Sequence, residues 1–506
     1  MTEPRTTLGD EPLTARAVAS VARGRADPAL AYAARRRIAE SHNTLLEQTA
    51  AGTRIYGVTT GLGAVADTVV AADDAERQRR VVLGRSVGVG RIATDTEVRA
   101  MMTARLAGFA VGRSGVSPPV AECLLALLRH GVNPLVPMTA SLGEADLAAM
   151  AHIGSVVAGA GEARWRGEVL AGGDALARSG IVPPALVAKD GLALVSSNAA
   201  STGLGALAVI EATEALGGLV AAVALSFEGF RANVAPLAPE SVALRPAPGQ
   251  SAVASTLLGL LDGGDLTQPG AARRLQDPLS FRCVASVYGS AAAALKAATA
   301  AVELELNASD DNPAIVPGVG VVPTANFDST HLAQAFATLN LALARVAPTI
   351  GMRTHKLMSD SMSSLPRFLS PLQNGHSGFA PVQKTASALM AEIQHAAMPM
   401  PVWVMPVADG VEDVATLALS TVEKTREIVT RIRTLAAIEL MIAAQACDLR
   451  DAPVLGTGTT DVHRAVRERV VMLREDRATA SDIRTLDFLI AEGRFETIAN
   501  DLLAAV

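Results

Sequence analysis

The pattern of apolar and polar residues changes near residue 190 of this chain. Before that point, amphipathic helical stretches alternate with loops that contain glycine and proline, which predict turns and helix ends. We expect helices over residues 29–49, 97–111 and 120–128, and a short hairpin and helix within residues 164–186. Residues up to about 28 are expected to form a loosely ordered or strand-forming arm.

Beyond residue 190, long alanine-rich helical stretches dominate. They are apolar over much of their surface, so they must pack against one another or against other subunits, and an up-and-down bundle follows. The expected helices are residues 191–216, 281–305, 328–357, 378–395 and 411–449, with shorter helices from about residue 457. We therefore expect a mainly α fold, with a mixed N-terminal domain over residues 1–200 and a long-helix bundle with C-terminal helices over residues 201–506.

Composition and charge narrow the class of protein. Half of the 506 residues are apolar but only 3% are aromatic, so the core must be aliphatic. The formal net charge is −6 without a basic tract, which argues against a nucleic-acid partner. The three cysteines are far apart and odd in number, which suits a reducing cytoplasm. The N-terminus is polar, and the most apolar run, near residues 217–227, is roughly half a bilayer span, so we expect a cytoplasmic protein with no membrane partner.

Common cofactor and metal motifs are missing from the sequence. The eight histidines are scattered, and neither HExxH nor CxxC occurs, so no metal site is predicted. The sequence also has no Walker loop and no GxGxxG after a strand.

A set of motifs between about residues 56 and 469 resembles the histidine/phenylalanine ammonia-lyase family. The motifs are YGVTTGLG, SGVSPPV, KDGLALVSSNA, LQDPLSFRC, LNASDDNP, NFDSTHLAQA, NGHSGF and VEDV. The resemblance implies the family's long-helix fold and a small-molecule substrate that carries a carboxylate. It also implies a homotetramer whose active sites combine residues from three subunits.

The signature loop of that family differs in this chain. In the family, an Ala-Ser-Gly triplet cyclises and loses water to make the electrophile methylidene-imidazolone (MIO). Aligned on Asp-Leu-Ala at 146–148, the triplet here is Gly-Glu-Ala at 143–145, so Glu144 replaces the serine. The loop, residues 139–146, is also one residue shorter, and a shifted register would use Ser141. Since Leu142 is a poor ring-closing residue, we predict that MIO is absent and that no cofactor is needed.

Three matching positions suggest chemistry. Tyr56 falls on the family's loop tyrosine, which is implied to remove a β-proton; the alternative is a packed tyrosine on a mobile loop. Arg282 matches the arginine that holds the substrate carboxylate, and Asn312 matches an asparagine that assists it. A guanidinium fork pairs with both carboxylate oxygens, although an internal ion pair with Asp277 or Asp311 is the alternative.

Further positions match the family's pocket. Gln276 and Phe327 fall on pocket positions, and Glu412 is a candidate proton carrier. The alternative for Glu412 and the adjacent Asp413 is a pair of carboxylates that cap the start of a helix.

Four positions depart from the family. Ser196 replaces an asparagine next to MIO, and Leu279 replaces a second loop tyrosine. Arg85 stands where the family reads the substrate's ring, which suggests an anionic or strongly accepting distal group. Lys384 replaces an apolar position on a pocket-facing helix, and a buried lysine needs a partner, such as Glu144 or a substrate anion. A solvated surface lysine is the alternative.

These residues suggest an elimination that needs no electrophile. MIO converts a primary amine into a good leaving group, whereas a quaternary trimethylammonium leaves as trimethylamine without activation. Ergothionases, MIO-free relatives of the family that split ergothioneine, follow this logic, and the chain looks like such a C–N lyase. The same residues also suit an isomerase or cyclase, a conjugate-addition enzyme, or a non-catalytic protein that retains the fold.

Overall fold

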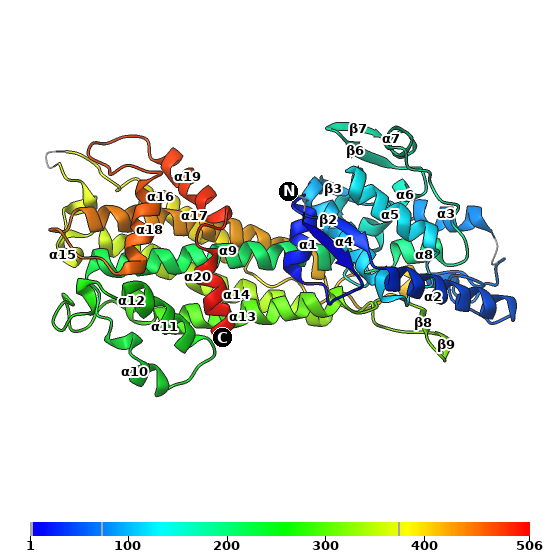
Figure 1. Cartoon of the computed structure of the whole chain (residues 1–506), viewed down its shortest axis with the longest axis horizontal. Coiled ribbons are helices and arrows are strands. Elements are labelled where there is room, and N and C mark those ends of the chain that lie inside the picture. Colours follow the sequence, from blue (N-terminus) through cyan, green and yellow to red (C-terminus); the bar gives the residue numbers. More distant parts are fainter. Residues whose placement is uncertain (1–3, 72–73, 373–374) are drawn as a thin grey trace. The chain divides into compact units, whose positions relative to one another are not determined.

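The computed structural model describes residues 4–71, 74–372 and 375–506, and helices account for most of them, so the fold is mainly α (Figure 1). The chain separates into two compact units. The first comprises Met1–Ile210, Thr299–Gln334 and Pro399–Glu423, and the second comprises Glu211–Ala298, Ala335–Met398 and Lys424–Val506. The sequence led us to expect two consecutive domains that divide near residue 200. Each observed unit instead consists of three separate stretches of the chain.

The strands of the first unit form small sheets. Strands β1 (Arg5–Leu8) and β2 (Asp27–Leu30) are parallel, with Arg5 opposite Asp27 and Leu8 opposite Leu30. The antiparallel pairings are β3 (Val89–Ile92) with β5 (Pro137–Thr139), β6 (Glu162–Trp165) with β4 (Asn133–Pro134) and β7 (Glu168–Ala171), and β8 (Ala314–Val316) with β9 (Gly320–Val322).

The helices of the first unit have clear start and stop signals. Thr94 and Glu97 form a capping box at the start of α4, and α5 begins with Pro118 and ends before Gly131, whose φ is +66°. The helices are α1 (Ala15–Ala22), α2 (Tyr32–Ala50), α3 (Ala75–Leu83), α4 (Asp95–Val111), α5 (Pro118–His130), α6 (Leu147–Val157), α7 (Gly172–Ser179) and α8 (Asp190–Val195), with single turns η1 (Gly63–Val65) and η5 (Ala408–Gly410).

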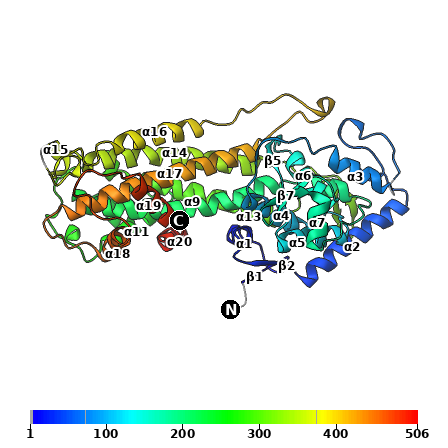
Figure 2. The same cartoon turned by 90° about the horizontal axis from the view of Figure 1, so that it is seen from above.

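The second unit contains the long helices, which run alongside one another in both views (Figures 1 and 2). They are α9 (Ala199–Phe230), α13 (Val284–Leu306), α14 (Thr330–Leu357) and α17 (Ala418–Asp448), each of which has one end in the first unit. The shorter elements are α10 (Pro239–Ala243), α11 (Gln250–Leu261), α12 (Leu279–Arg282), α15 (Asp360–Ser363), α16 (Val382–Ala396), α18 (Thr457–Arg467), α19 (Ala480–Ala491) and α20 (Glu496–Ala505), and the turns η2 (Ala235–Leu237), η3 (Asp265–Thr267) and η4 (Arg367–Leu369).

Most expected helices are confirmed, and three expectations need correction. The N-terminal arm contains α1 as well as strands, because Thr14 caps a helix that packs against α4. The helix expected over 191–216 breaks between α8 and α9, because Ser197 Oγ and the N–H of Asn198 donate to Asp310, at 2.7 and 2.5 Å. The helix expected from residue 411 begins at Ala418, so Glu412 does not cap its start.

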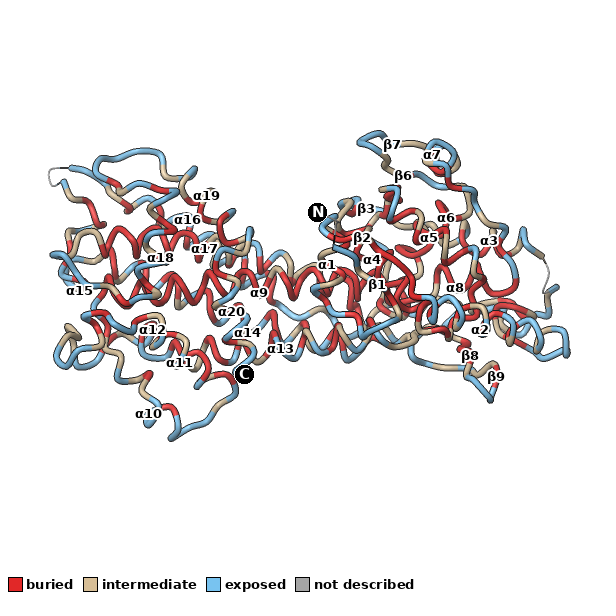
Figure 3. Tube along the Cα trace, in the orientation of Figure 1, coloured by how far each residue is buried: buried red, intermediate tan, exposed pale blue. Residues whose placement is uncertain are grey.

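Two helical stretches among the described residues are long and apolar enough to cross a membrane by length and composition alone. They are Asp190–Phe230, whose most apolar window is 94% buried within the protein, and Thr330–Leu357, whose window is 50% buried. Burial continues along most of α9 (Figure 3), so this apolar helix is much longer than the run near residues 217–227. Buried core helices of other proteins meet the same criteria of length and composition, so both stretches are weak evidence for a membrane partner. The absence of a membrane partner stays a prediction.

Candidate active site

A cavity of about 410 Å³ lies in the first unit, where loops from distant parts of the sequence meet. Its walls come from the loop after α2, the end of α3, the loop before α6, the end of α8 and segments that precede α14 and α17. Seven of the eleven residues predicted to form the site line this cavity: Tyr56, Arg85, Glu144, Ser196, Asn312, Phe327 and Glu412.

Tyr56 is held on a loop that folds back on itself. The N–H of Ile55 donates to Thr59 Oγ1 at 2.7 Å, and Gly57 adopts a φ of +73°, which glycine tolerates without strain. The N–H of Gly63 donates to the phenol oxygen of Tyr56 at 3.0 Å. The side chain is only half-buried, and its oxygen acts as a hydrogen-bond acceptor, which is the polarity that suits a base.

Arg85 brings positive charge to the same cavity. It lies just after α3, and its Nη1 donates to the carbonyl of Val81 at 3.2 Å. Burial lowers the pKa of the Arg85 guanidinium, while attraction to Tyr56 and Glu412 opposes that shift.

Buried Asp146 ties down the loop before α6. Its carboxylate accepts hydrogen bonds from Ser141 Oγ at 2.5 Å, and from the N–H and Oγ of Ser201 at 2.6 and 2.8 Å. Gly143 adopts a φ of +85°, and a Cβ there would lie 2.1 Å from Thr416 Oγ1. The Ser141 hydroxyl is therefore held by Asp146, and Ser141 is not among the residues that line the cavity.

Glu144 lies in the cavity wall close to Phe327. An isolated antiparallel bridge joins Glu144 to Asp328, and the N–H of Ala145 donates to the carbonyl of Phe327 at 3.4 Å. Burial, together with the carboxylates of Asp328 and Glu412, raises the pKa of Glu144 to about 7. Its Oε1 is buried and has no hydrogen-bond partner in the part of the chain that the structure describes.

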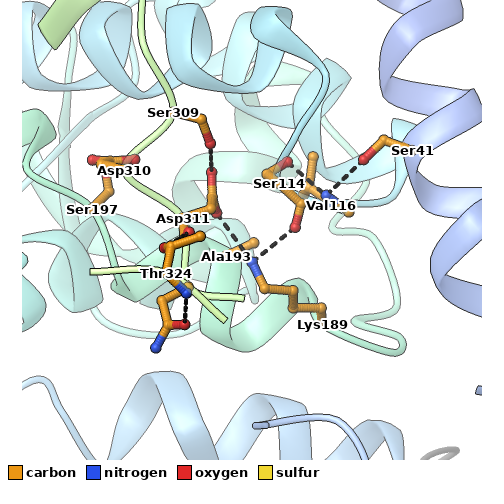
Figure 4. Close-up of polar contacts among 12 residues, drawn as sticks. Ser41, Ser114, Val116, Lys189, Ala193, Ser197, Ser309, Asp310, Asp311 and Thr324 are labelled. Carbon is orange, nitrogen blue, oxygen red and sulfur yellow. Dashed lines mark hydrogen bonds and ion pairs between the residues drawn. The ribbon is translucent and has the colours of Figure 1, made fainter. Parts of the chain in front are cut away.

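Asn312 is positioned by a buried ion cluster, part of which is drawn in Figure 4. Asp311 Oδ1 accepts from Lys189 Nζ at 3.1 Å (Figure 4). It also accepts from Arg105 Nη2 at 3.0 Å. Burial disfavours the charge on Asp311, but the two cations outweigh it and hold the pKa of Asp311 below its usual range. Asn312 Oδ1 accepts the N–H of Thr324 at 2.9 Å, so the amide NH₂ of Asn312 is available to a ligand.

Nine further lining residues are not among the predicted site residues: Leu62, Gly63, Ala66, Ala145, Leu147, Leu192, Val411, Asp413 and Val414. Most are apolar or small, and such residues carry no chemical signal outside their three-dimensional context. Asp413 was considered as a helix cap, but it lies in a segment without regular secondary structure before α17. The sequence signal that could have identified Asp413 as a lining residue was its position next to Glu412 in the VEDV motif.

The remaining predicted site residues belong to the second unit and do not line the cavity. They are Gln276, Leu279 and Arg282, at or before α12, and Lys384 on α16, and all four are exposed. Within the described residues, neither ion pair considered for Arg282 is formed: Asp277 accepts the N–H of Asn233, and Asp311 is paired with two other cations. The expected burial of Lys384 is not found in the single chain, where this lysine is solvated as in the alternative interpretation.

Comparison with known proteins identifies the family. A family model described as aromatic amino acid lyase matches residues 13–468. The chain is 37% identical to histidine ammonia-lyase of Anaeromyxobacter sp. (strain K) over 502 residues, which cover 97% of this chain and 99% of that protein. The chain belongs to the aromatic amino acid lyase family. Membership makes it a lyase-family enzyme related to proteins that act on small amino-acid substrates.

Solved structures of the aromatic amino acid lyase fold include two proteins with different names. Ergothionase from Treponema denticola, in complex with desmethyl-ergothioneine sulfonic acid, matches with a TM-score of 0.90 and 30% identity, covering 97% of this chain and 99% of that chain. Tyrosine aminomutase from Streptomyces globisporus matches with a TM-score of 0.92 and 30% identity, covering 98% of each chain. The shared fold therefore does not by itself choose the reaction.

The residues of the signature loop do not fit the family's electrophile. Glu144 has no hydroxyl on its Cβ, so it cannot lose water to leave a methylidene group. Ala145 stands where the ring-closing glycine is expected. In the shifted register, the hydroxyl of Ser141 is bound to Asp146, and Ser141 lies outside the cavity lining.

Proposed function

We propose that the chain is a C–N lyase that works without MIO. It eliminates a good leaving group, such as trimethylamine, from a carboxylate-bearing compound derived from an amino acid. The observation that carries the proposal is Glu144 in the wall of a cavity that also contains Tyr56 and Arg85. A site with this composition retains a base for the β-proton but lacks the serine from which the electrophile is made.

In this proposal, Tyr56 removes the β-proton as a phenolate. The N–H of Gly63 and the charge of Arg85 both favour negative charge on the phenol oxygen. The electron pair of the broken C–H bond forms the new double bond, and the C–N bonding pair leaves with neutral trimethylamine. Glu412, close enough to Arg85 to affect its pKa, then carries the abstracted proton to solvent.

The substrate carboxylate is assigned to Arg282 and Asn312. Arg282 is exposed on the single chain and does not line its cavity, so we propose that a homotetramer supplies this arginine from another subunit. Lys384, also exposed, is assigned in the same way to charge delocalised into the substrate's ring. The match to ergothionase supports this choice among the reactions of the family.

The test is turnover of a defined panel by the purified protein: ergothioneine, hercynine, histidine, phenylalanine and tyrosine. Ultraviolet absorption and mass spectrometry report any α,β-unsaturated acid, and trimethylamine is measured separately. We expect product and trimethylamine from one or both betaines, and nothing from the three free amino acids. Turnover of a free amino acid would show that an electrophile forms and would overturn the proposal. Binding of the betaines without turnover would favour a non-catalytic protein instead.

A further inference from the structure

We propose that Glu144 and Phe327 together form a binding site for a quaternary ammonium group. The cavity would then select substrates with a fixed positive charge on the carbon that bears the carboxylate. This inference rests on the proposed function and names the substrate class of the same site.

The backbone brings the two residues close together. Glu144 bridges to Asp328, the residue after Phe327, and the carbonyl of Phe327 accepts the N–H of Ala145. Both Glu144 and Phe327 line the cavity. A carboxylate and an aromatic side chain are thus presented to one ligand by neighbouring strand-like segments.

Glu144 needs a partner that the described part of the chain does not supply. Its Oε1 is buried without a hydrogen-bond donor, and a buried polar atom in that state is costly unless a ligand compensates it. A quaternary ammonium has no N–H to donate, so it is recognised by negative charge and by the faces of aromatic rings. Glu144 offers the charge, and Phe327 offers the ring.

The charges around the cavity also favour a cation at this place. Glu144, Glu412 and Asp413 line it, and the carboxylate of Asp328 acts on Glu144, whereas Arg85 is a lining cation. Carboxylates therefore outnumber cations on the walls of this cavity. The substrate carboxylate on the same carbon therefore needs the compensating charge of Arg282 and the amide of Asn312, as proposed above.

The experiment compares ligands of the same shape but different charge. Ergothioneine is paired with an isosteric analogue in which a neutral tert-butyl group replaces trimethylammonium. Binding to the full-length protein is measured by calorimetry in a Tyr56→Phe background, which prevents turnover. We expect ergothioneine to bind at least about tenfold more tightly than the neutral analogue, in line with a cation next to a carboxylate and an aromatic ring.

Variants then assign this preference to residues. Glu144→Gln is expected to reduce the ratio of affinities for ergothioneine and the neutral analogue to about one, whereas Glu144→Asp should retain a ratio of at least about threefold. Phe327→Leu should reduce the ratio about threefold, because losing one ring removes a smaller attraction than losing the full charge. Glu47→Gln is the matched control, because it removes one carboxylate charge from the exposed face of α2, outside the cavity lining, and we expect it to change the preference less than twofold.

An unchanged preference in Glu144→Gln would overturn the inference, as would equal binding of the two ligands before any substitution at Glu144. Failure of the proposed function is a separate result. It would appear as this charge preference in a protein that, with Tyr56 intact, releases no trimethylamine from either betaine.

Discussion

The phenol oxygen of Tyr56 lies 3.0 Å from the backbone nitrogen of Gly63, whose N–H donates a hydrogen bond to it. The phenol oxygen is therefore a hydrogen-bond acceptor for the same loop that carries Tyr56. Gly63 also connects the tyrosine loop to the segment before α17, since a Cβ on Gly63 would lie 4.0 Å from Glu412 Oε1. Tyr56 and its proposed proton acceptor, Glu412, therefore both lie close to Gly63.

Tyr56→Phe removes only the phenol oxygen and should stop proton removal. We expect kcat for betaine elimination to fall by about 10²- to 10⁴-fold with a KM change below about threefold, as for the loss of a general base. Steady-state release of trimethylamine measures both constants. Tyr32→Phe is the control, because Tyr32 is 78% exposed at the start of α2. Wild-type kcat in Tyr56→Phe would remove Tyr56 from the mechanism.

Mixed oligomers should test whether active sites are shared. Tyr56→Phe and Arg282→Met are each expected to be nearly inactive alone. If Tyr56 and Arg282 of one active site come from different subunits, co-expression of the two variants should form some active sites in which both residues are wild type. Each residue is then wild type in about half of the sites, so activity should return to about a quarter of wild type or less. Trimethylamine release and the molar mass in solution are the measurements. No recovery in oligomers verified to contain both variants would place Tyr56 and Arg282 in the same subunit.

Glu305 should make the folded protein less stable as pH rises. Burial and the carboxylate of Asp310 raise the pKa of Glu305 to about 7. Between about pH 4.5 and 7, the unfolded chain loses this proton while the folded chain keeps it, so the free energy of unfolding falls across that window by up to about 3 kcal/mol. Glu305→Gln should therefore unfold at higher denaturant concentration than wild type at pH 8, with little difference at pH 4.5.

Glu47→Gln is the matched control for this titration, because Glu47 is exposed on α2. It should leave the unfolding midpoint within experimental error of wild type at both pH values. A Glu305→Gln protein that is destabilised at pH 8 would mean that the ionised carboxylate stabilises the fold, contrary to its raised pKa.

Gly143→Ala should disrupt the signature loop without unfolding the chain. The added Cβ would meet Thr416 Oγ1 at 2.1 Å and the backbone nitrogens of Leu417 and Ala418 at 2.8 Å. We expect at least about a hundredfold loss of kcat, since small displacements at a reacting centre have effects of that size. Gly180→Ala is the control: its φ is +74°, but nothing lies within 4 Å of the added carbon. It should cost roughly 1 kcal/mol of stability and leave activity intact.

Local sequence was sufficient to predict most helices, the mainly α fold and the residues of the signature loop. Helical periodicity and caps act over a few residues, which is why α2, α4 and α5 were predicted closely from their own segments. The replacement of serine by Glu144 is likewise a property of the sequence alone, and its chemical consequence follows from the missing hydroxyl.

Long-range packing settled what local sequence could not. The break between α8 and α9 depends on Asp310, more than 100 positions away, and the late start of α17 accompanies a bridge between Val407 and Glu412. The bridge between Glu144 and Asp328 and the unpartnered oxygen of Glu144 are also properties of the folded chain. Hydrogen bonding and burial between residues this far apart leave no periodic trace in sequence, because each contact is set by the whole fold.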